Sequence, residues 1–148
     1  MENKNQPLGF TLRQITTEQF ATVAEAVAEG KEIGIKASLR FGVDQAHRVI
    51  ANFSKFEFDQ EEKPILIIEV GCQFEVDPSS WGELKSNETG VITLPKGFAA
   101  HLAMLTVGTA RGVLHAKTEK TPFNQLMLPT INVASMIKED VVLSDVPV

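Results

Sequence analysis

The 148-residue sequence contains one cysteine, no tyrosine and no long apolar run. A lone cysteine cannot build a disulfide framework or a cysteine-based zinc site, and it suits a reducing cytoplasm. No run approaches the roughly 20 apolar residues that a membrane span requires, and residues 1–10 lack the apolar core of a secretion signal. We therefore expect a cytoplasmic protein that does not insert into a membrane.

Basic residues are also scarce, because 14 lysines and arginines accompany 19 acidic residues and the net charge is −5. Non-specific nucleic-acid binding depends on a basic surface, so a nucleic-acid partner is not expected. Hydrophobic residues make up 43% of the chain, which favours a folded core over disorder. The length suits a single domain over residues 1–148.

The motifs of common catalytic sites are missing. The sequence has neither G-x-G-x-x-G nor a P-loop, and Ser79-Ser80 lacks the glycines of a nucleophile elbow. The three histidines do not have metal-ligand spacing, and Cys72 lies in an apolar, strand-like context that is typical of an inert buried thiol. Glu69 has no second carboxylate or base that could pair with it. We therefore expect no metal, no cofactor and no catalysis, and a small-ligand enzyme is the weakest alternative.

Alternating apolar residues indicate four consecutive strands, at residues 8–16, 31–42, 46–59 and 63–76. Between the first two strands, residues 17–30 are rich in alanine and glutamate and end at Gly30, which favours a helix. An irregular crossover is the alternative there. The acidic run at residues 57–62 indicates a hairpin tip.

Two helices are expected after the strands. Pro95 suits the start of a helix, and the apolar residues of 96–118 cover about half of the helix circumference, whereas one sheet face would need a stripe of about 100°. A short helix is expected near residues 133–138. This order predicts an α+β fold with a four-stranded antiparallel meander sheet, in which the long helix and the short C-terminal helix pack on one face.

The remaining arc of the long helix contains two glycines four residues apart. Each mid-helix glycine costs about 1 kcal/mol relative to alanine, and close approach of the same helix in a second subunit would explain that cost. Simple tolerance of glycine is the alternative. The residues that we expect at an oligomer interface are Met104, Gly108, Arg111, Gly112 and His115.

Residues 121–132, TPFNQLMLPTIN, are apolar but are interrupted by Pro122 and Pro129. Proline disfavours both a regular helix and a central strand, so we expect an extended segment that is either a buried connector or the binding edge of a groove. Exposed apolar surface usually marks an interaction site, and such a groove suits an extended polypeptide. The residues expected to contact a polypeptide are Phe41, Phe53, Phe56, Phe74, Trp81, Phe123 and Leu126, with the core as the alternative location for any of them.

Residues 110–132 resemble the C-terminal signature of the SecB family of protein-export chaperones. Two upstream segments, 10–15 (FTLRQI) and 67–70 (IIEV), are similar to the first and fourth strands of that family. The matching positions are Ala110, Arg111, Phe123, Gln125, Leu126 and Leu128 in register, with Pro129 and Asn132 displaced by one residue.

The resemblance implies a dimer of dimers assembled through the long helix, with grooves that hold unfolded or precursor proteins without ATP or a cofactor. It also implies that Ile67 and Glu69 on the outer sheet face contact the translocase motor SecA. The family's acidic N-terminal segment is replaced at residues 16–20, so an alternative is a SecB-like chaperone that guards an antitoxin in a toxin–antitoxin system. A non-chaperone protein of the same fold, whose apolar surface is consumed by oligomerisation, is another.

Overall fold

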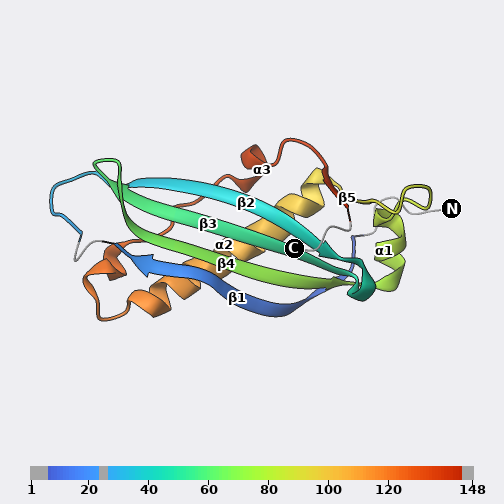
Figure 1. Cartoon of the computed structure of the whole chain (residues 1–148), viewed down its shortest axis with the longest axis horizontal. Helices are drawn as coiled ribbons and strands as arrows, with labels where there is room; N and C mark the ends of the chain where they lie inside the picture. The colour runs from blue at the N-terminus through green and yellow to red at the C-terminus, as the bar shows by residue number, and fades with distance from the viewer. Residues whose placement is uncertain (1–6, 24–26, 145–148) are drawn as a thin grey trace.

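The computed structural model describes residues 7–23 and 27–144. Four antiparallel strands form the main sheet in the order β1-β4-β3-β2 (Figure 1). This confirms the predicted α+β fold, with the meander confined to β2, β3 and β4, because β1 pairs with β4 at the opposite edge from β2. The strands are β1 (Phe10–Thr22), β2 (Gly34–Asp44), β3 (Val49–Gln60) and β4 (Lys63–Val76).

The helix predicted for residues 17–30 is wrong, because β1 continues to Thr22. Pairing with β4 along the whole strand, across two bulges, overrides the local helix preference of this segment. Residues 24–26 lie outside the described part of the chain. Residues 27–30 form no helix, and the Gln60 side chain holds this crossover by accepting from the Ala28 N–H at 2.9 Å and donating to the carbonyl oxygens of Ala28 and Lys31.

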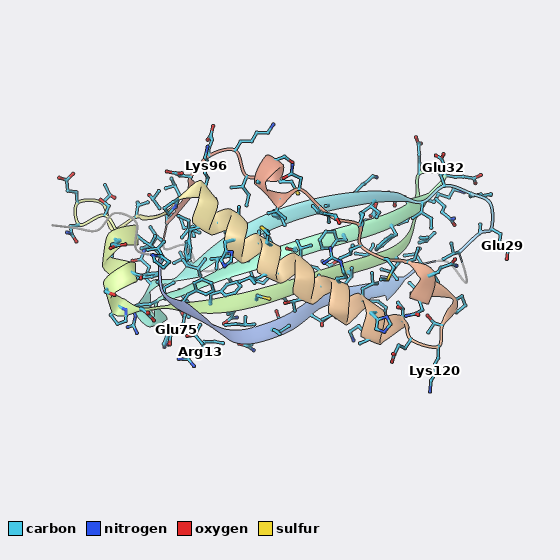
Figure 2. The ribbon with its side chains drawn as sticks, turned by 180° about the vertical axis from the view of Figure 1, so that it is seen from behind. Arg13, Glu29, Glu32, Glu75, Lys96 and Lys120 are labelled. Atoms are coloured by element: carbon cyan, nitrogen blue, oxygen red, sulfur yellow. The ribbon has the colours of Figure 1, made fainter. Side chains whose placement is uncertain are left out.

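One long helix, α2 (Lys96–Thr118), lies across one face of the sheet, as Figure 2 shows from behind. Its bounds confirm the prediction, and a short helix is also present within the predicted 133–138 region. A two-stranded sheet of β5 and β6 is also present and was not predicted, since no strand was expected after residue 76. The remaining elements are η1 (Gln45–His47), α1 (Pro78–Leu84), β5 (Ile92–Leu94), η2 (Pro122–Gln125), α3 (Val133–Met136) and β6 (Val141–Leu143).

The hydrophobic core lies between α2 and the sheet. Alternate residues of β4 from Leu66 to Val76 point toward α2 and are buried, and Leu102, Ala103 and Leu114 of the helix pack on them. In the part of the chain that the structure describes, no helix lies over the outer face of the sheet (Figure 1). No helix in residues 7–23 and 27–144 is both long enough and apolar enough to cross a membrane.

The turn between β3 and β4 places two glutamates in the left-handed region, Glu61 at φ 52° and Glu62 at φ 63°. Two-residue hairpin turns with positive φ at both positions favour Asn-Gly. Replacing Glu61-Glu62 by Asn-Gly should therefore raise the free energy of unfolding by about 1–2 kcal/mol. The lost Lys31–Glu61 ion pair joins exposed groups and contributes little.

Urea denaturation of the purified protein measures this gain. The matched control is Glu88→Asn, because Glu88 is exposed in a turn and has no positive φ. An Asn-Gly variant that is no more stable than the control would contradict this account of the turn.

Candidate functional site

The apolar segment 121–132 returns alongside α2 on the side that faces β2 (Figure 2). Phe123, Leu126 and Leu128 are buried and join the core, whereas Met127 between them is exposed. The segment therefore forms a wall of packed residues beside α2. Phe123 and Leu126, which we predicted to contact a polypeptide, leave almost no surface for a ligand in this chain.

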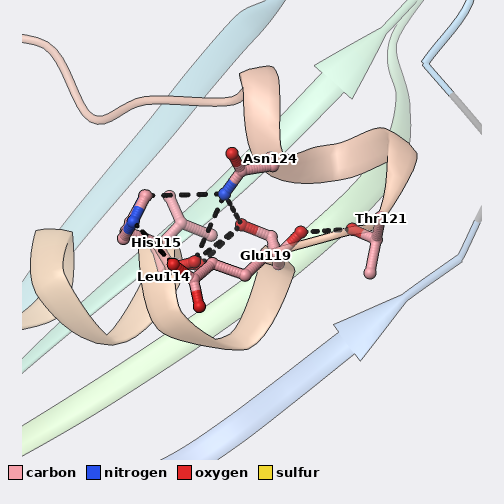
Figure 3. Close-up of polar contacts among 6 residues, drawn as sticks. Leu114, His115, Glu119, Thr121 and Asn124 are labelled. Atoms are coloured by element: carbon pink, nitrogen blue, oxygen red, sulfur yellow. Dashed lines mark hydrogen bonds and ion pairs between the residues drawn. The ribbon is translucent and has the colours of Figure 1, made fainter.

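Side-chain hydrogen bonds at the end of α2 direct this return (Figure 3). The Thr121 hydroxyl donates to the carbonyl oxygen of Thr118 at 2.7 Å, and the Thr118 hydroxyl donates to that of Leu114 at 2.7 Å. The Asn124 amide donates to the carbonyl oxygen of His115 at 3.3 Å and to the Thr118 hydroxyl at 3.1 Å. The bonds to the carbonyl oxygens of Thr118 and His115 satisfy groups that the end of a helix leaves free, and together the four bonds fix the direction in which the chain leaves α2.

Arg111 holds the segment further along. Its Nε donates to the carbonyl oxygen of Leu128 at 3.2 Å, and Nη2 donates to that of Pro129 at 3.1 Å. Arg111 was predicted at an oligomer interface, but in this chain its guanidinium connects α2 to the returning segment.

A cavity of about 270 Å³ lies between α2 and the returning segment, and we call it the α2 groove. Five of the seven residues that line it have apolar side chains, although its exposed surface is as polar as it is apolar, and Arg111 is the one charged residue among the described residues that line it. Such a surface can bury apolar groups of a ligand and can place one cation beside them. The lining residues are Met104, Val107, Arg111, Leu128, Thr130, Ile131 and Val133.

The five other aromatic residues predicted to contact a polypeptide are not gathered at this groove. Phe56, Phe74 and Trp81 are buried in the core, where large aromatic side chains contribute most to stability. Phe41 is half-buried and packs against the core from β2, and Phe53 lies on the outer face of the sheet. The apolar residues of 121–132, interrupted by two prolines, were the signal for the groove wall.

On the outer face, Phe53 is enclosed by its neighbours. Its ring lies directly over Gly71, where an added Cβ would come within 2.7 Å of two ring carbons. The Arg40 guanidinium covers the other side of the ring, at 3.8 Å from the centroid. Arg40 Nε also lies 3.4 Å from the Glu69 carboxylate, so Glu69 is buried and paired, while Ile67 beside it is half-buried.

The other carboxylates of β3 and β4 also pair with cations from the edge strands. Glu75 binds Arg13 at 2.7 Å, and the hydrogen bond from Arg13 lowers the pKa of Glu75. Lys36 lies 3.5 Å from Asp59 and 3.6 Å from Glu57, and the charge of Asp59, followed by that of Glu57, raises the pKa of Lys36. This face is therefore charge-balanced and does not form an acidic patch.

Three further large apolar residues are exposed, Leu12 and Ile15 of β1 and Leu105 of α2, and we call them the β1 patch. Leu12 pairs with Phe74 and Ile15 with Cys72, so both side chains point to the side of the sheet that α2 covers. They nevertheless remain 44% and 49% exposed, and Leu105 is 41% exposed. The helix therefore leaves part of β1 uncovered.

The residues of the predicted oligomer interface divide into two groups. Gly108, Gly112 and His115 are exposed on α2, and a Cβ added at either glycine would meet nothing within 4 Å. Packing within the chain therefore does not require these glycines. Met104 is exposed and, like Arg111, lines the α2 groove.

Together, the sheet order, the long helix and the returning segment define a SecB-like fold. A solved structure with this fold is that of Mycobacterium tuberculosis Rv1957, a SecB-like chaperone in complex with a ChAD peptide from the Rv1956 HigA1 antitoxin. It is similar to the present chain at a TM-score of 0.53 and 12% identity, over 83% of this chain and 91% of that one.

A protein of unknown function from Streptococcus agalactiae gives a TM-score of 0.40 at 12% identity, over 85% of this chain and 99% of that one. No family model matches the sequence, and no curated protein matches it. At 12% identity, the similarity to Rv1957 shows the fold alone.

Proposed function

We propose that this protein is an ATP-independent chaperone that holds unfolded polypeptides in the α2 groove. The observation that carries the proposal is an open groove on a SecB-like fold, lined mostly by apolar residues, whose wall is held in place by Arg111. Apolar side chains of an extended polypeptide would gain roughly 25 cal/mol per Å² of buried surface there. Because the groove offers few fixed polar groups, binding would tolerate many sequences.

Two client classes follow from this proposal. Precursor proteins awaiting export are the first, supported by the resemblance of residues 110–132 to the export chaperones. An antitoxin segment is the second candidate, supported by the peptide in the Rv1957 complex. Contact of Ile67 and Glu69 with a translocase motor stays a prediction, and it would require Arg40 to leave Glu69.

We further propose that a second copy of the chain covers the β1 patch and the glycines of α2. Exposed apolar surface of this kind is typical of subunit interfaces, and β1 is an edge strand of the main sheet. Gly108 and Gly112 would allow the helices of two copies to approach closely. A dimer of dimers is the assembly that the family resemblance implies.

Binding in the α2 groove can be tested with two methionines that are almost equally exposed, Met104 at 58% and Met127 at 57%. Met104 lines the groove and Met127 does not. Met104→Gln should weaken the binding of an unfolded client about tenfold, because it removes an apolar contact that contributes about 1.4 kcal/mol to the binding free energy. Met127→Gln is the matched control and should bind as the natural protein does.

The measurement is suppression of aggregation of a chemically unfolded client, titrated to stoichiometric amounts without ATP, together with the dissociation constant for a labelled apolar peptide. A natural protein that neither suppresses aggregation nor binds the peptide would rule out the chaperone proposal. Equal losses in both variants would leave a chaperone whose clients bind elsewhere.

A further inference from the structure

The charge of the chain is unevenly distributed. Residues 95–138, which include α2 and the returning segment, contain five lysines and arginines but one acidic residue, Glu119. The remaining 104 residues contain nine basic and eighteen acidic residues. The part of the chain that forms α2 and the returning segment is therefore basic, although the whole chain is acidic.

Two of the three acidic groups in or next to this region are already engaged, and the third, Glu139, is exposed and does not line the α2 groove. Glu119 lies 3.4 Å from Nε2 of His115 at the end of α2, and the Asp140 carboxylate accepts the N–H of Lys96 at the start of the helix. The residues of β2 on the side of the sheet that faces α2 are apolar, and they are Ile35, Ala37, Leu39, Phe41 and Val43. The carboxylates of β3 and β4 pair with cations on the outer face. No described carboxylate lines the α2 groove or forms an ion pair with Arg111.

Arg111 supplies a positive charge within the groove itself. Nε and one N–H of Nη2 hold the carbonyl oxygens of Leu128 and Pro129, which leaves about three of the five guanidinium N–H groups for a ligand. Arg111 forms no ion pair with any carboxylate of residues 7–23 and 27–144. Hydrogen bonds from a guanidinium to a carboxylate are among the stronger polar contacts in proteins.

We propose that the α2 groove selects polypeptide segments in which an aspartate or glutamate stands beside apolar side chains. The apolar groups would contact Met104, Val107 and Ile131, and the carboxylate would bind Arg111. This inference rests on the proposed chaperone function, and it names the chemistry of the client. A nucleic acid would need several cations along its path, whereas the described lining has Arg111 alone among apolar residues.

Three peptides test the proposal. They share a core of leucine, phenylalanine and isoleucine and differ at two flanking positions, which hold aspartate, asparagine or lysine. The aspartate peptide should bind about tenfold more tightly than the asparagine peptide, and the lysine peptide should bind most weakly. The ratio between the first two should shrink as salt is added, because Arg111 is only partly buried.

Two variants that each remove one positive charge locate the effect. Arg111→Gln should reduce the aspartate-to-asparagine ratio to about one, whereas Lys138→Gln, an exposed lysine outside the groove lining, should preserve most of it. The ratio separates recognition from structure, because a loosened groove wall would weaken both peptides equally.

The outcomes separate the two proposals. Equal affinities for the aspartate and asparagine peptides would overturn the acidic preference and leave the chaperone proposal standing. A ratio that persists in Arg111→Gln would also overturn it. If no peptide binds and no client is protected, both proposals fail.

Discussion

Replacing Leu126 by alanine should lower the free energy of unfolding by about 3 kcal/mol. The side chain is buried against the core, and its removal leaves a cavity that the α2–sheet packing cannot fill. The matched control is Met127→Ala, which alters an exposed neighbour and should change stability by less than about 0.5 kcal/mol. Urea denaturation measures both values.

The same variant decides whether Leu126 is a core residue or contacts clients. From the sequence we had predicted a client contact. If it is a core residue, the folded Leu126→Ala protein should bind clients with nearly unchanged affinity below the denaturation midpoint. Full stability combined with lost client binding would reverse this assignment.

Replacing Gly108 and Gly112 together by alanine should stabilise the isolated chain and weaken its self-association. Each substitution should stabilise the helix by about 1 kcal/mol, since an added Cβ meets nothing within 4 Å inside the chain. Two methyl groups between closely approaching helices should raise the dissociation constant of the oligomer by at least about tenfold, because overpacking a tight contact costs about 1–3 kcal/mol.

Sedimentation over a range of protein concentrations measures the association, and thermal unfolding at low concentration measures the stability of the chain. Gly97→Ala is the control, because Gly97 is an exposed helical glycine at the start of α2. An unchanged oligomer with raised stability would mean that the glycines are merely tolerated.

The elements with strong local signals were predicted within a residue or two. β4 and α2 have the expected bounds, because β-branched residues and Pro95 mark them locally. The end of β1 was missed, since its alanines and glutamates favour helix until pairing with β4 is considered. The β5–β6 pair has three residues in each strand and joins segments far apart in the sequence, so no local pattern indicated it.

The candidate site was harder to predict for a different reason. Large aromatic side chains are frequent both in cores and at interfaces, so residue type alone could not separate Phe56 and Phe74 from surface residues. The α2 groove depends on the path of the chain after α2, and that path depends on bonds from Asn124 and Arg111 to carbonyl oxygens. Such long-range contacts with the main chain leave no periodic pattern in a sequence.

Arg111 donates its hydrogen bonds to main-chain oxygens of the returning segment, so these two bonds place no requirement on the side chains there. Phe123, Leu126 and Leu128 anchor the same segment in the core, whereas Thr130 is exposed and lines the groove. Thr130 can therefore be exchanged for larger, smaller or charged residues while the wall keeps its position. A library varied at this position should yield proteins of one shape with different client preferences.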